Sequence, residues 1–333
     1  MPTRAFICGC VGFDLTPGEH LFLREAQPWG LILFRRNVET PAQVARLVAQ
    51  FRDCVGRAAP VLIDQEGGRV QRLGPPHWRI YPAAASLALL GDASAHVVRL
   101  AARLMAYDLA ILGINVNCLP VLDVPTAGGH AVIGNRAYGN DPPNVARLGR
   151  AAACGLMAGG VLPVMKHIPG HGRAGADTHL ELPVVAASRA ELESSDFAAF
   201  RACRDLPVAM TAHVVYAAID PSGPATTSAV VVQDIIRDFI GFDGLLISDD
   251  VSMKALSGTF AEKTARLFAA GVDIALHCNG DLAEARDVAG ASPILAGRAL
   301  QRADAALAQL RAPEPFDPED AAAELDRALA VLA

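Results

Sequence analysis

The chain has 333 residues, of which 52% are hydrophobic and 19% are charged, and its formal net charge at pH 7 is -6. This length is enough to bury one large hydrophobic core or two modest ones. Because no block of like charges occurs, we expect no nucleic-acid partner and no membrane partner.

The first residues and the cysteines both bear on the cellular compartment. The apolar run before Asp14 is too short for the core of a signal peptide. No stretch reaches the roughly 18 uncharged apolar residues that a membrane span needs. The seven cysteines are scattered through apolar runs, as is typical of reduced, buried thiols. We therefore expect a cytoplasmic protein.

Short β-rich runs alternate with longer amphipathic stretches along the chain. The predicted strands are 5–10, 30–34, 61–64, 114–119, 162–166, 208–213, 245–250 and 273–278, and the predicted helices include 41–57, 95–112, 143–157, 189–204 and 228–240. Eight βα units of this length predict an α/β fold of the (β/α)8 TIM-barrel type. A doubly wound open sheet is the alternative, but it would not require eight strands at such regular spacing.

A proline-rich break near the C-terminus is followed by one more helical pattern. Asp317 and Pro318 are the residue types that favour the cap and the first turn of a helix. We expect a single TIM-barrel domain over residues 1–333, in which residues 313–333 form a C-terminal helix that packs on the barrel.

Polar residues follow several of the predicted strands. In a TIM barrel the catalytic residues lie at these C-terminal strand ends, and a charged group there is costly unless it is paired or used. Such ends therefore predict a polar ligand pocket on one face of the barrel. The strand ends in question carry Asp64 to Arg72, Lys166 with His167, His213, Asp249 with Asp250, and His277.

The segment from Lys166 to His179 is the strongest candidate for an active-site loop. It contains three of the nine histidines and several glycines directly after an apolar run. Asp177 and His179 lie two residues apart, so the carboxylate can orient the imidazole and stabilise its protonated form. This pair predicts a general acid/base, whereas His171, between two glycines, is expected to shape the loop.

Asp249 is the best isolated carboxylate to act as a nucleophile on an electrophilic carbon. A nucleophilic carboxylate with a separate proton donor is the arrangement of retaining glycoside hydrolysis, although the usual donor is a second carboxylic acid. Asp250, Asp123 and Glu66 are expected to have structural roles in their loops. The residues predicted to hold hydroxyl or acyl groups of a polyhydroxylated substrate are Asp64, Arg72, Arg136, Lys166 and His167.

Three other functions remain open from the residues alone. A metal-dependent hydrolase could use His167, His171, His179 and Asp249 as ligands, but the lysine beside His167 would repel a cation. A sensor of cell-wall fragments would not need the nucleophile and the acid/base pair. A phosphorylase would use phosphate in place of water, which a histidine acid/base would not repel. We expect no metal and no cofactor.

Several motifs closely resemble glycoside hydrolase family 3. They comprise residues 64–72, 120–124, 133–139, 166–172 with 177–179, and 248–253, and they occur in the family's order between about residue 30 and residue 279. More narrowly, they resemble the single-domain bacterial β-N-acetylhexosaminidases of peptidoglycan recycling. The Asp-x-His pair at Asp177 and His179 marks that branch. Ile168 and Val251 depart from the commoner family residues but keep an apolar side chain.

The resemblance implies a monomeric TIM-barrel enzyme with a small-molecule substrate. It would release terminal, non-reducing β-linked N-acetylglucosamine (GlcNAc), with retention, from 1,6-anhydro-N-acetylmuramic acid with or without its peptide. Asp249 falls on the family's nucleophile, His179 on its acid/base and Asp177 on the partner of that histidine. His213 is expected to support the pocket. The sugar-binding positions fall on Asp64, Arg72, Arg136, Lys166 and His167.

Overall fold

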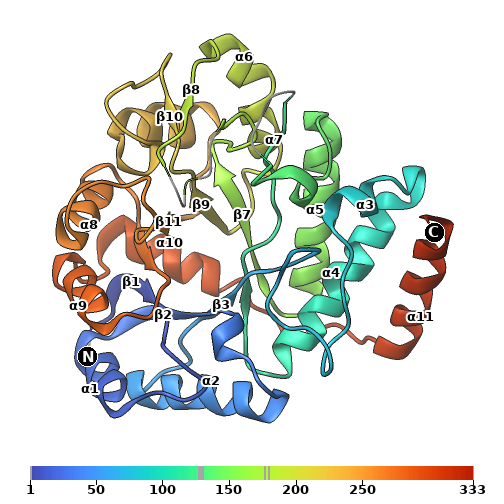
Figure 1. Cartoon of the computed structure of the whole chain (residues 1–333), viewed down its shortest axis with the longest axis horizontal. Coiled ribbons are helices and arrows are strands. Elements are labelled where there is room, and N and C mark those ends of the chain that lie inside the picture. The colour runs from blue at the N-terminus through green and yellow to red at the C-terminus, as the bar shows by residue number, and fades with distance from the viewer. Residues whose placement is uncertain (1, 127–130, 176–177, 179–180, 333) are drawn as a thin grey trace.

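The computed structural model describes every residue except 1, 127–130, 176–177, 179–180 and 333. Eight parallel strands close into a barrel in the order β1-β12-β11-β9-β7-β6-β3-β2, so the predicted TIM barrel is confirmed (Figure 1). The strands are β1 (Arg4–Cys8), β2 (Pro28–Leu33), β3 (Val61–Ile63), β6 (Val116–Asn117), β7 (Leu162–Ile168), β9 (Val208–Thr211), β11 (Leu245–Asp250) and β12 (Ile274–His277).

Alternation of side chains along each strand divides the core into two layers. In β1, for example, Ile7 belongs to the cluster inside the barrel, whereas Phe6 and Cys8 belong to the cluster between barrel and helices. Helix α10 (Gly297–Leu307) adds Ala303 and Ala306 to the inner cluster. Because both layers are apolar, the strands are nearly continuous hydrophobic runs, as parallel strands require.

Helices surround the barrel, and several begin at a side-chain cap of the expected kind. Thr16 and Thr259 each form a capping box with the glutamate three residues on, and Asp141 caps α5. These helices are α1 (Pro17–Ala26), α2 (Pro41–Val55), α3 (Ala84–Ala88), α4 (Ser94–Ala110), α5 (Pro142–Ala158), α8 (Phe260–Ala269) and α9 (Leu282–Ala291).

Two predicted helices differ from the structure. The stretch 189–204 is two helices, α6 (Arg189–Ser194) and α7 (Asp196–Ala202), because Ser195 leaves helical geometry and its hydroxyl donates to the Glu191 carbonyl at 2.6 Å. The stretch 228–240 is wound as a π-helix, η5 (Val231–Phe239). Apolar spacing over two turns does not distinguish π from α winding.

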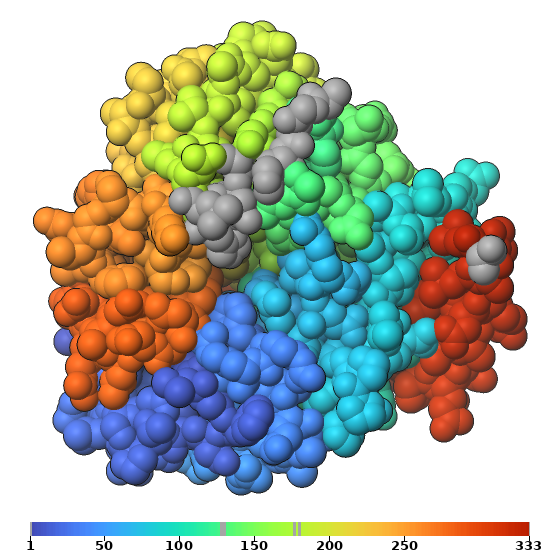
Figure 2. Space-filling model, in the orientation of Figure 1, coloured from blue at the N-terminus to red at the C-terminus, as the bar shows by residue number. Residues whose placement is uncertain are grey.

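The C-terminal helix α11 (Pro318–Leu329) lies against α4 at the edge of the molecule, where Figure 2 shows it in red beside the cyan segment. Its cap is Asp317, whose carboxylate accepts the N–H groups of the second and third helical residues. The side chain of Leu325 is completely buried.

Two short two-stranded sheets accompany the barrel, one antiparallel and one parallel. Strands β4 (Gln65–Gly67) and β5 (Val70–Gln71) pair in antiparallel fashion directly after β3, and β8 (Val184–Val185) pairs with β10 (Val215–Tyr216). Within the described part of the chain, no helix is both long and apolar enough to cross a bilayer.

If α11 unfolds together with the barrel, Leu325→Ala should lower the free energy of unfolding by about 3 kcal/mol, because it leaves a cavity under the helix. Denaturant unfolding followed by circular dichroism measures this change. Val331→Ala, at a position 81% exposed, is the control and should have little effect. An unchanged midpoint for Leu325→Ala would mean that α11 is not part of the cooperative unit.

Candidate active site

A pocket of about 390 Å³ opens at the C-terminal ends of the strands, within the size range of small-molecule sites. Its floor contains the inward-facing Ile32, Met210 and Leu276. Its polar walls include six of the eight residues predicted from the sequence, namely Asp64, Arg72, Arg136, Lys166, His167 and Asp249.

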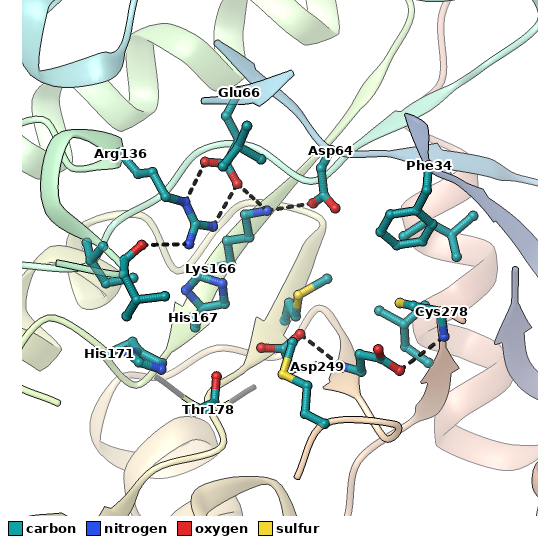
Figure 3. A pocket seen from close by; sticks show the side chains of 18 of the residues that line it. Phe34, Asp64, Glu66, Arg136, Lys166, His167, His171, Thr178, Asp249 and Cys278 are labelled. Carbon is teal, nitrogen blue, oxygen red and sulfur yellow. Dashed lines mark hydrogen bonds and ion pairs between the residues drawn. The ribbon is translucent and has the colours of Figure 1, made fainter. Parts of the chain in front are cut away.

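The other two predicted residues, Asp177 and His179, lie outside the described residues. Thr178 between them is described, buried and part of the pocket wall (Figure 3). Its carbonyl accepts the Ala255 N–H at 3.2 Å, from the loop that follows β11. The middle residue of the Asp-x-His pair therefore lines the same pocket as Asp249.

Lys166, near the end of β7, is the centre of a chain of ion pairs along one side of the pocket (Figure 3). Its ammonium lies 2.8 Å from Asp64 and 2.6 Å from Glu66. Arg136 holds Glu66 through two hydrogen bonds of 2.8 Å, and Arg72 lies 3.0 Å from Asp64. Each charged group in this series of ion pairs therefore has a partner of opposite charge before any substrate binds.

The ion pairs also fix the protonation states of the two acids. Burial alone would raise the pKa of Asp64, but Lys166 and Arg72 outweigh it and hold that pKa well below its usual value. The pKa of Glu66 is lowered against its burial by Lys166 and Arg136. Both acids are thus carboxylates at neutral pH and can accept hydrogen bonds from sugar hydroxyls.

His167 is oriented by a buried carboxylate from the loop after β6. Asp123 accepts the Nδ1 proton of His167 at 2.7 Å and the backbone N–H groups of His167 and His171 at 3.2 and 2.6 Å. Burial would raise the pKa of Asp123, but the neighbouring His167 outweighs it and holds that pKa at about 2. The ionised carboxylate fixes the proton on Nδ1 and leaves Nε2 for a ligand.

Asp249 is the penultimate residue of β11, with its side chain in the pocket and only 7% of the residue exposed. The Asp250 N–H donates to its carboxylate at 2.8 Å. Burial would raise the pKa of Asp249, but the nearby His167 and His213 and this N–H lower it overall. Asp249 is therefore ionised at neutral pH.

His213 and Asp250 support the Asp249 segment. His213 is buried, contacts Thr226 at 2.7 Å and lies 3.0 Å from the Asp250 carbonyl, so it supports the pocket as predicted. The Asp250 carboxylate accepts the N–H groups of Ser252 and Cys278, both at 3.0 Å, and so joins the loops after β11 and β12.

A family model described as the glycosyl hydrolase family 3 N-terminal domain matches residues 19–309. The chain belongs to glycoside hydrolase family 3. As a member of this family it is a glycoside hydrolase, and the predicted family resemblance is confirmed.

Among its relatives, a β-hexosaminidase of Nitrosomonas eutropha is 37% identical over 281 residues, which cover 80% of this chain and 78% of that one. A β-hexosaminidase of Pseudomonas aeruginosa is 38% identical over 271 residues, or 80% of both chains. The crystal structure of NagZ from Neisseria gonorrhoeae is similar with a TM-score of 0.85 and 32% identity, over 99% of this chain and 97% of that chain.

Glu66 and Asp123 are expected from the sequence to have only structural roles, but each also contacts a side chain of this family 3 pocket. Glu66 lines the cavity and pairs with Lys166 and Arg136. Glu66 lies two residues after Asp64, and residues two apart in an extended segment point to the same side, so this spacing could have indicated its place in the pocket. Asp123 stabilises its loop as predicted, but it also orients His167, which lies 44 residues later in the chain. Nothing in the local sequence indicates that second contact.

The interpretation of the strand ends as pocket residues was wrong for His277. Its imidazole contacts Glu284 of α9 at 3.1 Å and packs edge-on against Phe260 of α8, while its neighbours Leu276 and Cys278 line the pocket. Alternation along β12 turns this side chain to the outer layer. Among the described residues, no three His, Cys, Asp or Glu side chains are grouped so as to hold a metal ion.

His171 should make the family 3 barrel less stable in mild acid. Burial lowers the pKa of His171 from 6.5 to about 4, so between these values the unfolded chain binds more protons and stability falls as the pH falls. Between pH 7 and pH 5 the parent protein should lose about 2 kcal/mol more unfolding free energy than His171→Gln. Denaturant titrations at both pH values measure the difference.

The control for this prediction is His77→Gln, at an exposed position away from the pocket. It should lose as much stability as the parent protein over the same pH interval. If His171→Gln also behaved like the parent, the buried imidazole would not be the source of the acid sensitivity.

Proposed function

We propose that the protein is a retaining β-N-acetylglucosaminidase that removes terminal GlcNAc from peptidoglycan fragments. The substrate is GlcNAc linked to 1,6-anhydro-N-acetylmuramic acid, with or without a peptide, as in cell-wall recycling. The observation that carries this proposal is the single pocket that joins ionised Asp249, the paired sugar-binding candidates and Thr178 of the Asp-x-His segment. The names of the similar β-hexosaminidases and a Neisseria gonorrhoeae NagZ complex with N-trifluoroacetyl-D-glucosamine support it.

In the first step Asp249 attacks the anomeric carbon and forms a glycosyl ester. His179 donates a proton to the departing glycosidic oxygen, and Asp177 orients the imidazole and stabilises its charged form. A low pKa keeps Asp249 ionised for this attack, and its position at the end of a barrel strand holds the carboxylate still.

In the second step His179 acts as a base and takes a proton from water, which attacks the anomeric carbon from the side that the leaving group vacated. Two inversions give net retention of the β configuration. The ester to Asp249 breaks, and the carboxylate is restored.

The remaining polar side chains bind the sugar. Asp64 and Lys166 are held in place by their ion pairs and present unused oxygen lone pairs and N–H groups to the pocket. His167 presents its Nε2 edge, and Arg72 and Arg136 add further donors. Because these groups are positioned in advance, little ordering cost remains when a sugar with several hydroxyls binds.

The proposal also covers the domain organisation, cellular compartment and partners of the enzyme. It acts as a single-domain, cytoplasmic monomer that needs no metal or cofactor and has no nucleic-acid or membrane partner. The negative net charge is unfavourable for binding nucleic acid or an anionic membrane, and a pocket of about 390 Å³ suits a small-molecule substrate.

The parent protein should hydrolyse an aryl N-acetyl-β-glucosaminide, but not the aryl β-glucoside, and proton NMR should first detect the β-anomer of free GlcNAc. Asp249→Asn should reduce kcat/KM by at least about 1,000-fold, since no covalent step remains. Circular dichroism checks that the variant is folded. Initial release of the α-anomer, formation of the sugar 1-phosphate in phosphate buffer, or full activity of the variant would contradict the mechanism.

For His179→Ala the loss should depend on the leaving group. A nitrophenolate leaves without protonation, whereas a sugar alkoxide does not, so kcat should fall by roughly 100-fold more for a disaccharide than for the nitrophenyl substrate. Steady-state kinetics on both substrates measure the ratio. Equal losses on the two substrates would argue against a role as general acid.

A further inference from the structure

Arg69 differs from every other cation that lines the pocket. Arg72, Arg136 and Lys166 each pair with a carboxylate. Arg69 instead donates only from Nη2, and only to backbone carbonyl groups of residues 131–133. A carbonyl oxygen accepts a hydrogen bond without neutralising the guanidinium, so Arg69 keeps its full positive charge.

Two nitrogen atoms of Arg69 remain available. In the described part of the chain, Nε and Nη1 have no hydrogen-bond partner, and neither is among the buried atoms that lack one. Arg69 is also the one described lining residue that is largely exposed, whereas Lys166 and Asp249 are 2% and 7% exposed. Its charge therefore faces the mouth of the pocket and not the floor.

The local backbone fixes this position. Gly67 and Gly68 have φ values of +95° and +56°, and a Cβ atom on Gly67 would lie 2.3 Å from the Pro82 carbonyl oxygen. The turn between β4 and β5 thus requires glycine, and it packs closely against residues 81–83. It carries Arg69 beyond the end of β3, where Asp64 lies, and places it beside the half-buried Val70 and Val132.

We propose that Arg69 binds a free carboxylate on the leaving-group sugar and so favours the peptide-free form of the substrate over the form whose lactyl carboxyl is in a peptide bond. This inference rests on the function proposed above. An enzyme that removes a terminal sugar holds that sugar at the buried end of the pocket, next to Asp249, so the rest of the substrate lies toward the mouth. The lactyl ether of N-acetylmuramic acid places a carboxylate on that next sugar. A guanidinium without a carboxylate partner is the matching group.

The experiment compares two disaccharides that differ only at this group: GlcNAc linked to 1,6-anhydro-N-acetylmuramic acid with a free lactyl carboxylate, and the same compound with that carboxyl converted to the primary amide. For the parent protein, kcat/KM should favour the acid. Arg69→Gln should reduce the ratio of the two kcat/KM values by roughly 10-fold to 100-fold, because a charge-assisted hydrogen bond is lost from one substrate only. Arg69→Lys should retain part of the preference.

The control is Arg35→Gln, which removes an exposed arginine that follows β2 and lies outside the pocket lining. It should leave the ratio as in the parent protein. If Arg69 only holds the 131–133 segment, both substrates will be affected alike and the ratio will not move, which would overturn the inference. If the parent protein cleaves neither disaccharide but does cleave the aryl substrate, the proposed peptidoglycan substrate is wrong and the inference falls with it.

Discussion

The buried ammonium of Lys166 is the contact on which the arrangement of the pocket depends. It lies at the end of a barrel strand, 2% exposed, and is compensated by Asp64 and Glu66. A buried charge without a partner at this depth would cost several kcal/mol of stability. Removing Asp64 or Glu66 would therefore leave the Lys166 ammonium with less compensation for its burial. Arg72 pairs with Asp64 and Arg136 pairs with Glu66. The ion pairs thus fix the relative positions of five side chains that come from three separate segments of the chain.

The sequence predicts some parts of the molecule and not others, depending on whether the feature is local in the chain. The barrel was predictable because each strand is a local apolar run, and the polar strand ends named Lys166, His167 and Asp249 in advance. The contact between Asp123 and His167 was not predictable, since it joins residues far apart in the chain. His277 was assigned to the pocket because its sequence position is right, and only the facing of β12 excludes it. Local sequence patterns predict the secondary-structure elements and the residue types at the site. The direction in which each side chain points depends on tertiary packing.

The pocket thus contains two kinds of charge. Near the floor, Lys166 and Arg136 each have an acidic partner, and under the proposed function these pairs position donors and acceptors for neutral hydroxyl groups. Toward the mouth, Arg69 has only carbonyl partners and retains an uncompensated charge. Neutral hydroxyls are recognised by geometry, for which paired and rigid groups suffice. An anionic group is recognised by charge, for which an unpaired cation is needed.

The Lys166-to-His179 segment leaves the barrel between firm attachments. Gly172 packs so closely that a Cβ atom there would lie 2.1 Å from the Val124 carbonyl oxygen, and Arg173 bonds to Asp196 of α7 at 2.6 Å. Thr178 is attached again, by Ala255 from the loop after β11. For Asp249, the nucleophile that we propose, the barrel strand fixes the backbone and so limits the directions from which the carboxylate can attack. The contact with Ala255 holds Thr178 at the wall of the pocket that contains Asp249, and the acid/base role proposed for the Asp-x-His motif rests on that placement.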